Sequence, residues 1–184
     1  MTVALVRVYR PAAFAWGVAE ATLFFIVPDV LIGLVALHRL SRGIESAAWA
    51  TAGAIVGGGL VFAFPQAFQA VFPWVPGIDR AMLADAARRF GAEGWWAVIA
   101  APASGIPYKL YAAESALQGS SLLALVGVTA VARSWRFLGV ALLFGVVGTV
   151  ARASVAAHEG RWLAGYVAFW SVVYLVYYAT STTR

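Results

Sequence analysis

Apolar positions along the chain form long runs separated by short polar segments. Residues 46–64, 120–150 and 162–180 are such runs, with small or apolar side chains at most positions. A helix needs roughly 20 predominantly apolar residues to cross the hydrocarbon core of a bilayer. The pattern therefore predicts an all-α integral membrane protein in which these three segments are transmembrane helices.

The apolar segment 12–43 differs from a simple spanning helix. Glu20, Pro28 and Asp29 interrupt it, and basic residues flank it on both sides. Carboxylates and a helix-breaking proline are costly near the middle of a bilayer unless the chain turns there or the charges are paired. Because both ends carry the same kind of flank, we expect the segment to enter and leave on one side. It is predicted to be a re-entrant helical hairpin with its break at Pro28.

A second interrupted segment covers residues 94–118. Its apolar run contains helix-breaking residues followed by two charged side chains: Pro102, Gly105, Pro107, Lys109 and Glu114. Proline removes a backbone donor and glycine permits a sharp turn, so these positions are expected to interrupt a helix. The same argument therefore predicts a second re-entrant hairpin.

Two polar segments are predicted to lie at the membrane surface. Residues 1–10 place two arginines among apolar side chains, which is typical of an interfacial helix, and Pro11 is expected to end it. Residues 79–93 carry apolar side chains at helical spacing opposite charged ones. This spacing predicts an amphipathic surface helix.

The two halves of the chain resemble each other. Placing Pro28 over Pro107 also lays the segment 46–64 over the core of 120–150. Each half is then a hairpin followed by one transmembrane helix, and a single span per half reverses the orientation of the second copy. The pattern predicts two inverted repeats with an extra C-terminal transmembrane helix, 162–180. Broken helices at matching positions of two inverted halves indicate a transport site near the midplane.

The composition supports a membrane protein and narrows its chemistry. The chain is 62% hydrophobic and 11% charged, whereas soluble domains average roughly 25% charged residues. It has no cysteine, and its two histidines, His38 and His158, are far apart. Thiolate and histidine-cluster metal sites are therefore excluded, and no cofactor is expected. The net charge of +5 comes from scattered basic residues, so we expect anionic membrane lipids as partners rather than nucleic acid.

Six charged residues are predicted to lie at membrane depth, where each costs a few kcal/mol. They are Glu20, Asp29, Lys109, Glu114, Arg133 and Arg136. One interpretation is that they pair with one another and lock the hairpins together. The other is a polar cavity for a charged headgroup, in which the three cations bind phosphate and the three carboxylates exchange protons or balance charge. A Ser–Lys hydrolase built on Ser104 and Lys109 lacks a supporting motif, so no enzymatic activity is expected.

Three sequence strings resemble a known family: Glu20 with Phe24-Phe25-Ile26-Val27-Pro28-Asp29, Gly105-Ile106-Pro107-Tyr108-Lys109-Leu110, and Arg133-Ser134-Trp135-Arg136-Phe137. They are similar to motifs of the DedA family of membrane proteins, also called the SNARE-associated or VTT-domain family, and most closely of its small YqaA-like branch. The resemblance implies two facing re-entrant hairpins and movement of phospholipids or polyprenyl phosphates across the bilayer, often linked to the proton gradient. The chain departs from the family at Ala112-Ala113-Glu114-Ser115, where many members carry an Ala-Gly string, so the role of Glu114 is left open.

The expected function is that of a flippase- or scramblase-like lipid transporter in the bacterial cytoplasmic (inner) membrane. It would translocate a phosphate-bearing lipid such as a polyprenyl phosphate or a phospholipid, with proton coupling and homo-oligomer formation left open. The alternative is a non-transporting membrane assembly or scaffold protein whose buried charges only specify the fold. For topology, an excess of six arginines over four predicts which ends face the cytoplasm. The cytoplasmic set is Arg7, Arg10, Arg39, Arg42, Arg152 and Arg161, and the outer set is Arg80, Arg88, Arg89 and Arg184.

Overall fold

Helices account for almost all of the chain. The structure, a computed structural model, describes the backbone of residues 3–181 and the side chains of residues 8–101 and 104–179. The described backbone contains helices, turns and short loops but no β-strand. The predicted all-α class is confirmed.

Three helices are long and apolar enough to cross a membrane: α3 (Leu40–Ala63), α9 (Leu122–Val150) and α11 (Glu159–Ser181). They cover the segments that the sequence predicts to be transmembrane, which supports a membrane protein. α9 has 29 residues and is about 44 Å long at 1.5 Å per residue. That length exceeds the ~30 Å hydrocarbon core, so residues in the middle of α9 lie far from both of its ends.

The first interrupted segment folds as two helices around a break. α1 (Val3–Thr22) is followed by the non-helical residues 23–28 and then by α2 (Asp29–His38). α2 leads through an extended Arg39 directly into α3. The helix is therefore interrupted at Pro28, as the sequence predicts, because Pro28 precedes the first residue of α2.

Pro11 does not end a helix. It lies inside α1, so the prediction that the first helix stops at this residue is wrong. A proline removes one backbone hydrogen bond, but in apolar surroundings the remaining backbone groups have no water to bind and keep their helical partners. Residues 1–2 of the predicted interfacial helix lie outside the described residues.

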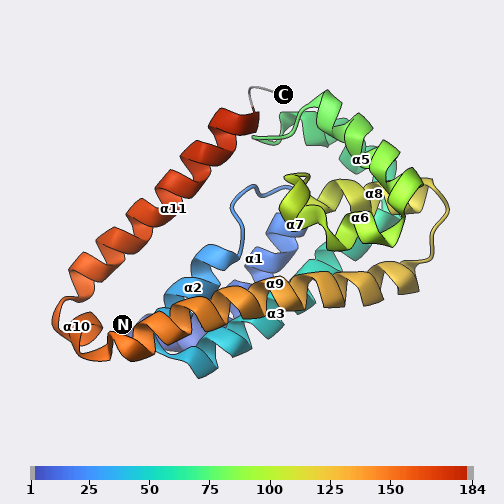
Figure 1. Ribbon diagram of the computed structural model, residues 1–184. Helices are drawn as coiled ribbons and strands as arrows, with labels where there is room; N and C mark the ends of the chain where they lie inside the picture. The colour runs from blue at the N-terminus through green and yellow to red at the C-terminus, as the bar shows by residue number, and fades with distance from the viewer. Residues whose placement is uncertain (1–2, 182–184) are drawn as a thin grey trace.

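α1 packs closely along α3. A Cβ atom added to Gly53 of α3 would overlap the backbone oxygen of Phe14 in α1, so only glycine permits this approach. Near the start of both helices, Arg10 Nη2 lies 2.7 Å from Glu45 Oε2. The first part of α1, around residue 10, therefore lies beside the start of α3. α2 ends at residue 38, immediately before α3, so the chain comes back to the same end of the molecule (Figure 1).

A polar connector joins the two halves of the chain. It contains α4 (Pro65–Val71), the 3-10 helix η1 (Phe72–Trp74) and α5 (Arg80–Glu93). Asp79 caps α5 by accepting a hydrogen bond from the backbone N–H of Met82 at 2.7 Å. α5 coincides with the helix predicted at 79–93, buries Ala86 and Phe90, and exposes most of its polar residues.

The second interrupted segment is divided into three short helices: α6 (Trp95–Ile99), α7 (Ala101–Ser104) and α8 (Tyr108–Leu117). Gly105 has a φ of +73°, a left-handed conformation that glycine adopts without strain and that ends α7. Pro107 then precedes α8. Pro102 lies in the first turn of α7, where a proline is tolerated. The main break is therefore at 105–107, and Pro102 marks only the minor step between α6 and α7.

α3 and α9 run antiparallel through the structure (Figure 1). Gly145 and Gly148, near the end of α9, lie against Leu40 and Leu37 at the start of α3 and the end of α2. After the short helix α10 (Arg152–Ala157), α11 passes beside the bundle. Most side chains of α11 are exposed, as expected for a helix that faces lipid.

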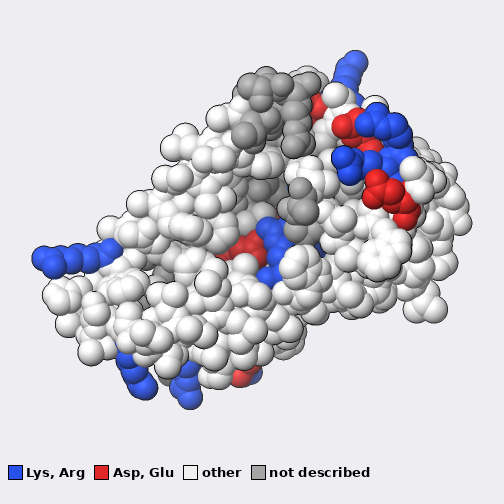
Figure 2. Space-filling model, viewed as in Figure 1, with Lys and Arg blue, Asp and Glu red and all other residues white. Residues whose placement is uncertain are grey.

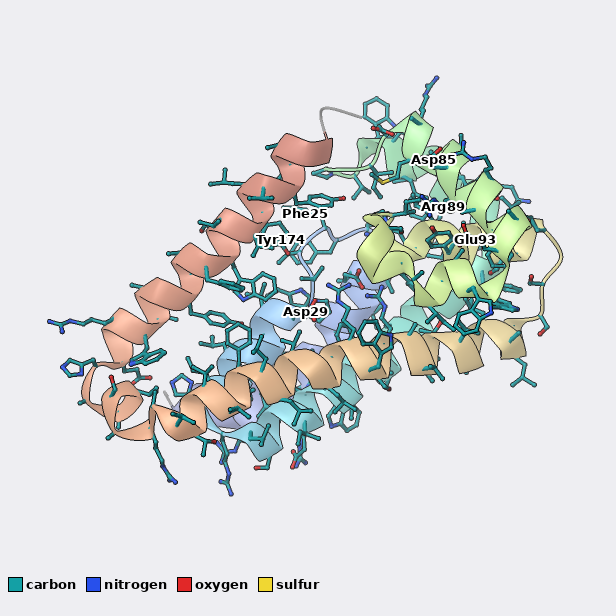
Figure 3. All side chains as sticks on the ribbon, viewed as in Figure 1. Phe25, Asp29, Asp85, Arg89, Glu93 and Tyr174 are labelled. Atoms are coloured by element: carbon teal, nitrogen blue, oxygen red, sulfur yellow. The ribbon has the colours of Figure 1, made fainter. Side chains whose placement is uncertain are left out.

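Charged side chains gather at two ends of the molecule (Figure 2). Arg10 and Glu45 pair near the starts of α1 and α3, which lie at one end (Figure 1). Figure 3 shows Asp85 and Arg89 on α5 at the other end, away from Asp29. The surface between the ends is almost free of charge in Figure 2, except for a hollow near its centre that contains both cationic and anionic groups. Such an apolar band between two charged ends matches the profile of a bilayer.

Candidate functional site

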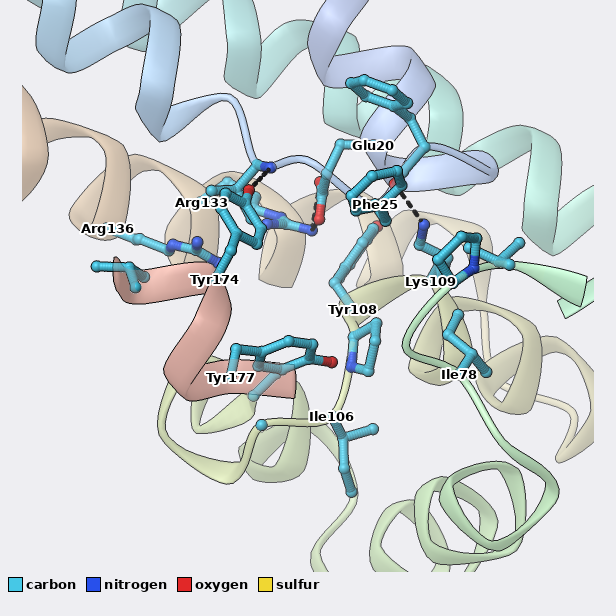
Figure 4. Close-up of a pocket in the computed structure, with 18 of the residues that line it drawn as sticks. Glu20, Phe25, Ile78, Ile106, Tyr108, Lys109, Arg133, Arg136, Tyr174 and Tyr177 are labelled. Carbon is cyan, nitrogen blue, oxygen red and sulfur yellow. Dashed lines mark hydrogen bonds and ion pairs between the residues drawn. The ribbon is translucent and has the colours of Figure 1, made fainter. Parts of the chain in front are cut away.

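The breaks of the two interrupted segments meet inside the molecule. Lys109, in the first turn of α8, donates a hydrogen bond from Nζ to the backbone oxygen of Phe24 at 2.8 Å. Phe24 belongs to the break between α1 and α2. The bond therefore joins two parts of the chain that are 85 positions apart (Figure 4).

A cavity of about 300 Å³ lies at this meeting point. Its charged lining consists of Glu20, Lys109, Arg133 and Arg136. Most of the remaining wall is apolar or aromatic and comes from the two breaks, from the residues before α5 and from α11 (Figure 4). A cavity with a few converging polar groups in an apolar wall is typical of a ligand site.

Arg133 and Glu20 form a buried ion pair at this cavity. Arg133 Nη2 lies 2.9 Å from Glu20 Oε2, and their side chains are only 4% and 7% exposed. The guanidinium also lies over the ring of Tyr108, with 4.5 Å between Cζ and the ring centroid. The Tyr108 hydroxyl in turn forms a 2.6 Å hydrogen bond with the Thr129 hydroxyl. These contacts fix Arg133 between α1 and α8.

Arg136, one turn further along α9, pairs with Asp29. Asp29 is the first residue of α2, where the positive end of the helix dipole favours a carboxylate. The Asp29 side chain is buried, whereas that of Arg136 is 25% exposed. Arg133 and Arg136 are three positions apart and therefore share one face of α9.

The site holds more cationic than anionic groups. Three cations, Lys109, Arg133 and Arg136, meet the two carboxylates of Glu20 and Asp29, so one positive charge is in excess. Each arginine has a carboxylate partner, while Lys109 forms no ion pair with any described carboxylate. Two polar atoms of these ion pairs are buried without a hydrogen bond to any described residue: the acceptor Asp29 Oδ1 and the donor Arg133 Nε. Buried polar atoms in this state are uncommon and often mark functional sites.

Glu114 does not lie with the other five charged residues. It accepts hydrogen bonds from Gln69 Nε2 and, at 3.4 Å, from Gln118 Nε2. Lys109 and Glu114 are five positions apart, which separates them by about 140° around a helix. They therefore face different neighbours, and the structure gathers five of the six predicted charges.

α11 contributes a wall of the cavity that the sequence analysis did not include in the site. The Tyr174 hydroxyl accepts a hydrogen bond from the Val27 N–H at 2.8 Å, and the Tyr166 hydroxyl donates to the Val30 oxygen at 2.7 Å. Aromatic residues near helix ends usually anchor a helix at the membrane interface. The sequence does contain a signal for this wall, which is the four-residue spacing of Tyr166, Trp170 and Tyr174. Residues with this spacing share one face of a helix, and in α11 that face packs inward.

Neither a metal-binding group nor a similarity to known proteins assigns a function to the chain. Within the described residues, no three His, Cys, Asp or Glu side chains are grouped so that they could hold a metal ion. Compared with known proteins, the chain matches no family model, no curated protein and no solved structure at a significant level. Its function is therefore inferred from the geometry and chemistry of the site.

Proposed function

We propose that the chain is a lipid transporter that moves a phosphate-bearing lipid, such as a phospholipid or a polyprenyl phosphate, across the bacterial cytoplasmic membrane. The observation that carries this proposal is the meeting of two helix breaks at a cavity lined by charged residues. Irregular backbone at membrane depth is tolerated where it lines a cavity. Transporters with broken helices hold their substrates at such places.

The position of the charges along α9 supports a site near the middle of the membrane. Arg133 and Arg136 lie close to the centre of this 29-residue helix, each at least about 16 Å from either end at 1.5 Å per residue. Unpaired charges at that depth are costly, and the cavity offers polar surroundings within an otherwise apolar exterior. A polar passage at this depth suits a headgroup that must cross the bilayer centre.

For the architecture, we propose two inverted repeats with facing re-entrant hairpins. Each half contains an interrupted helical segment followed by a long apolar helix, and α3 and α9 are antiparallel. The contact of Arg10 with Glu45 supports a first segment that returns to the side from which it started. These features agree with the resemblance to the DedA family, to which we propose the chain belongs. α11 would be the extra transmembrane helix.

Within this proposal, Arg136 and Lys109 contact the phosphate and Arg133 maintains the shape of the site. A guanidinium binds phosphate oxygens in a bidentate manner, and Arg136 is the more exposed of the two arginines. A phosphate bound at Arg136 would displace Asp29, whose carboxylate would then take up a proton. Asp29, together with Glu20, would thereby link lipid movement to the proton gradient.

One observation favours a second function. Both arginines already have carboxylate partners. Buried polar and ionic groups can determine how helices assemble without binding a ligand. The chain would then be a non-transporting membrane assembly or scaffold protein.

Reconstitution into liposomes distinguishes the two functions. The purified protein is incorporated into vesicles that contain a fluorescent phospholipid or a labelled polyprenyl phosphate. The fraction of label exposed to a membrane-impermeant quencher is followed with and without a pH gradient. A transporter accelerates exchange between the leaflets relative to protein-free vesicles. An unchanged rate with both lipids would overturn the proposal and favour a scaffold.

A further inference from the structure

Building on the proposed function, we infer that Lys109 makes the site selective for a negatively charged lipid headgroup. We further infer that its hydrogen bond to Phe24 is a latch between the two breaks, which such a headgroup opens. Both roles follow from the charge, the donors and the position of this one side chain.

The local charge balance identifies Lys109 as the group that attracts an anion. Arg133 and Arg136 are each compensated by a carboxylate. Lys109 is only 2% exposed and has an uncharged carbonyl as its partner. The carboxylate that acts on Lys109 electrostatically, Glu20, is already paired with Arg133, and a buried ammonium without a partner carboxylate of its own is costly. An anion that enters the cavity therefore gains most by approaching Lys109, whereas a zwitterionic headgroup leaves the excess charge uncompensated.

The hydrogen-bonding capacity of Lys109 is also incompletely used. An ammonium carries three N–H donors, and the bond to the Phe24 oxygen, at 2.8 Å, is the one found among the described residues. A phosphate oxygen is a stronger acceptor for an ammonium than a carbonyl is, because both groups are charged. A phosphate on a headgroup with no cation of its own would therefore take the ammonium from Phe24. In a zwitterionic headgroup the choline competes with Lys109 for the same phosphate oxygens, so the exchange is weaker.

The position of the bond gives this exchange a structural consequence. Phe24 lies in the break between α1 and α2, and Lys109 lies in the first turn of α8, the helix after the second break. Both residues line the cavity, and the bond joins the two segments where they meet (Figure 4). When a headgroup replaces Phe24 as the partner of Lys109, this tie is lost and the breaks are free to separate. Binding of an anionic headgroup thus loosens the contact between the two breaks, which the headgroup must pass.

Hydrogen–deuterium exchange at the first break tests the latch. The full-length protein is placed in nanodiscs of phosphatidylcholine, alone, with phosphatidylglycerol, or with inorganic phosphate in the buffer. Exchange of the backbone amides of residues 23–27 is then measured, since Pro28 has no N–H. Phosphatidylglycerol is expected to accelerate it about tenfold, the effect of losing one charge-assisted hydrogen bond. No acceleration would overturn the inference, and acceleration by inorganic phosphate alone would overturn the assignment to a lipid headgroup.

Variants of Lys109 separate the charge from the latch. Lys109→Met removes both, so exchange at residues 23–27 should be fast in every lipid and should not respond to phosphatidylglycerol. Lys109→Gln keeps a neutral donor and should also lose the response, which covers the case in which Lys109→Met does not fold. Lys109→Arg should respond like the wild type. Arg152→Gln, at an exposed arginine outside the cavity, is the matched control. A wild-type response in either neutral variant would overturn the inference.

Failure of the latch and failure of the transport proposal give different results. Exchange that depends on phosphatidylglycerol, without translocation in vesicles, would reject transport but keep Lys109 as an anion-selective latch. Equal translocation of phosphatidylglycerol and phosphatidylcholine, with unresponsive exchange at residues 23–27, would reject the latch but keep transport.

Discussion

At the scale of single residues, the two arginines of α9 have different surroundings although they lie one turn apart. Arg133 is enclosed between Glu20 and the ring of Tyr108, whereas part of Arg136 faces the cavity. A fully buried charge depends on its partner for stability, while a partly exposed charge is accessible to a ligand. The same substitution should therefore have different effects at the two positions.

Replacing Arg136 by alanine is expected to abolish lipid translocation while the protein stays folded and inserted. Asp29 would lose its partner but can become neutral by taking up a proton. Arg136→Lys should restore part of the activity, because an ammonium cannot reproduce the bidentate contact of a guanidinium. The measurements are translocation in vesicles and gel filtration in detergent, with Arg152→Ala as the control. A stable and fully active Arg136→Ala protein would contradict a role of this arginine in headgroup binding.

Replacing Arg133 is expected to affect stability instead. Arg133→Met leaves the Glu20 carboxylate buried without its partner and also removes the buried guanidinium from the ring of Tyr108, a contact that Arg136 lacks. Together these losses should lower the free energy of unfolding by about 3–5 kcal/mol. Adding Glu20→Met removes the orphaned charge as well and should recover much of the loss. Thermal unfolding in detergent, followed by circular dichroism, measures both effects. Wild-type stability of the single variant would show that this ion pair does not hold α1 against α9.

At the scale of helices, close packing of α1 on α3 positions Glu20 toward α9. Gly53 of α3 faces the backbone of Phe14 in α1, whereas Gly59 of the same helix faces open space. Small residues at a helix interface allow two backbones to approach closely, which is a main source of helix association in membranes. Gly53 and Gly59 therefore form a matched pair, because they lie in the same helix and differ mainly in whether they contact α1.

Gly53→Val is expected to destabilise the protein by about 1–3 kcal/mol, because the larger side chain forces α1 away from α3. Gly59→Val introduces the same side chain in the same helix, so effects of helix propensity are similar in both variants. The unfolding temperature of Gly53→Val should therefore be clearly lower than that of Gly59→Val. Equal unfolding temperatures would contradict close packing at Gly53.

At the scale of the whole molecule, two polar ends are separated by an apolar surface (Figure 2). The start of α1 and the start of α3 lie at one end, and α5 lies at the other (Figure 1). If α3 crosses the membrane, these two ends face different compartments. The arrangement therefore predicts which positions are accessible from the same side.

Single cysteines test this topology directly, because the chain has no cysteine of its own. Val8→Cys and Ser41→Cys should react with a membrane-impermeant maleimide from one side of the membrane, and Ala84→Cys from the other. All three positions are exposed. The comparison is made in right-side-out and inverted vesicles. Labelling of positions 8 and 41 from opposite sides would turn the first interrupted segment into an ordinary spanning helix and exclude a re-entrant hairpin.

The sequence by itself determined the helical class, the long apolar helices and the positions of the two breaks. These features are local, because apolar length and helix-breaking residues act over a few turns of chain. Charges such as Arg133 could be identified for the same reason, since they stand out within an apolar run. Pro11 shows the limit of a local rule: the helix continues through it where α1 packs along α3.

Only the tertiary structure decided which of these groups meet. Arg133 pairs with Glu20 and Arg136 with Asp29, across separations of 113 and 107 positions. Glu114 turns away from them, and α11 closes one side of the cavity with its tyrosines. Such contacts depend on how far and at what angle distant helices approach one another. That approach is set by packing of the whole molecule. A local pattern, such as the spacing of the α11 tyrosines, can indicate which face of a helix packs inward but not what that face meets.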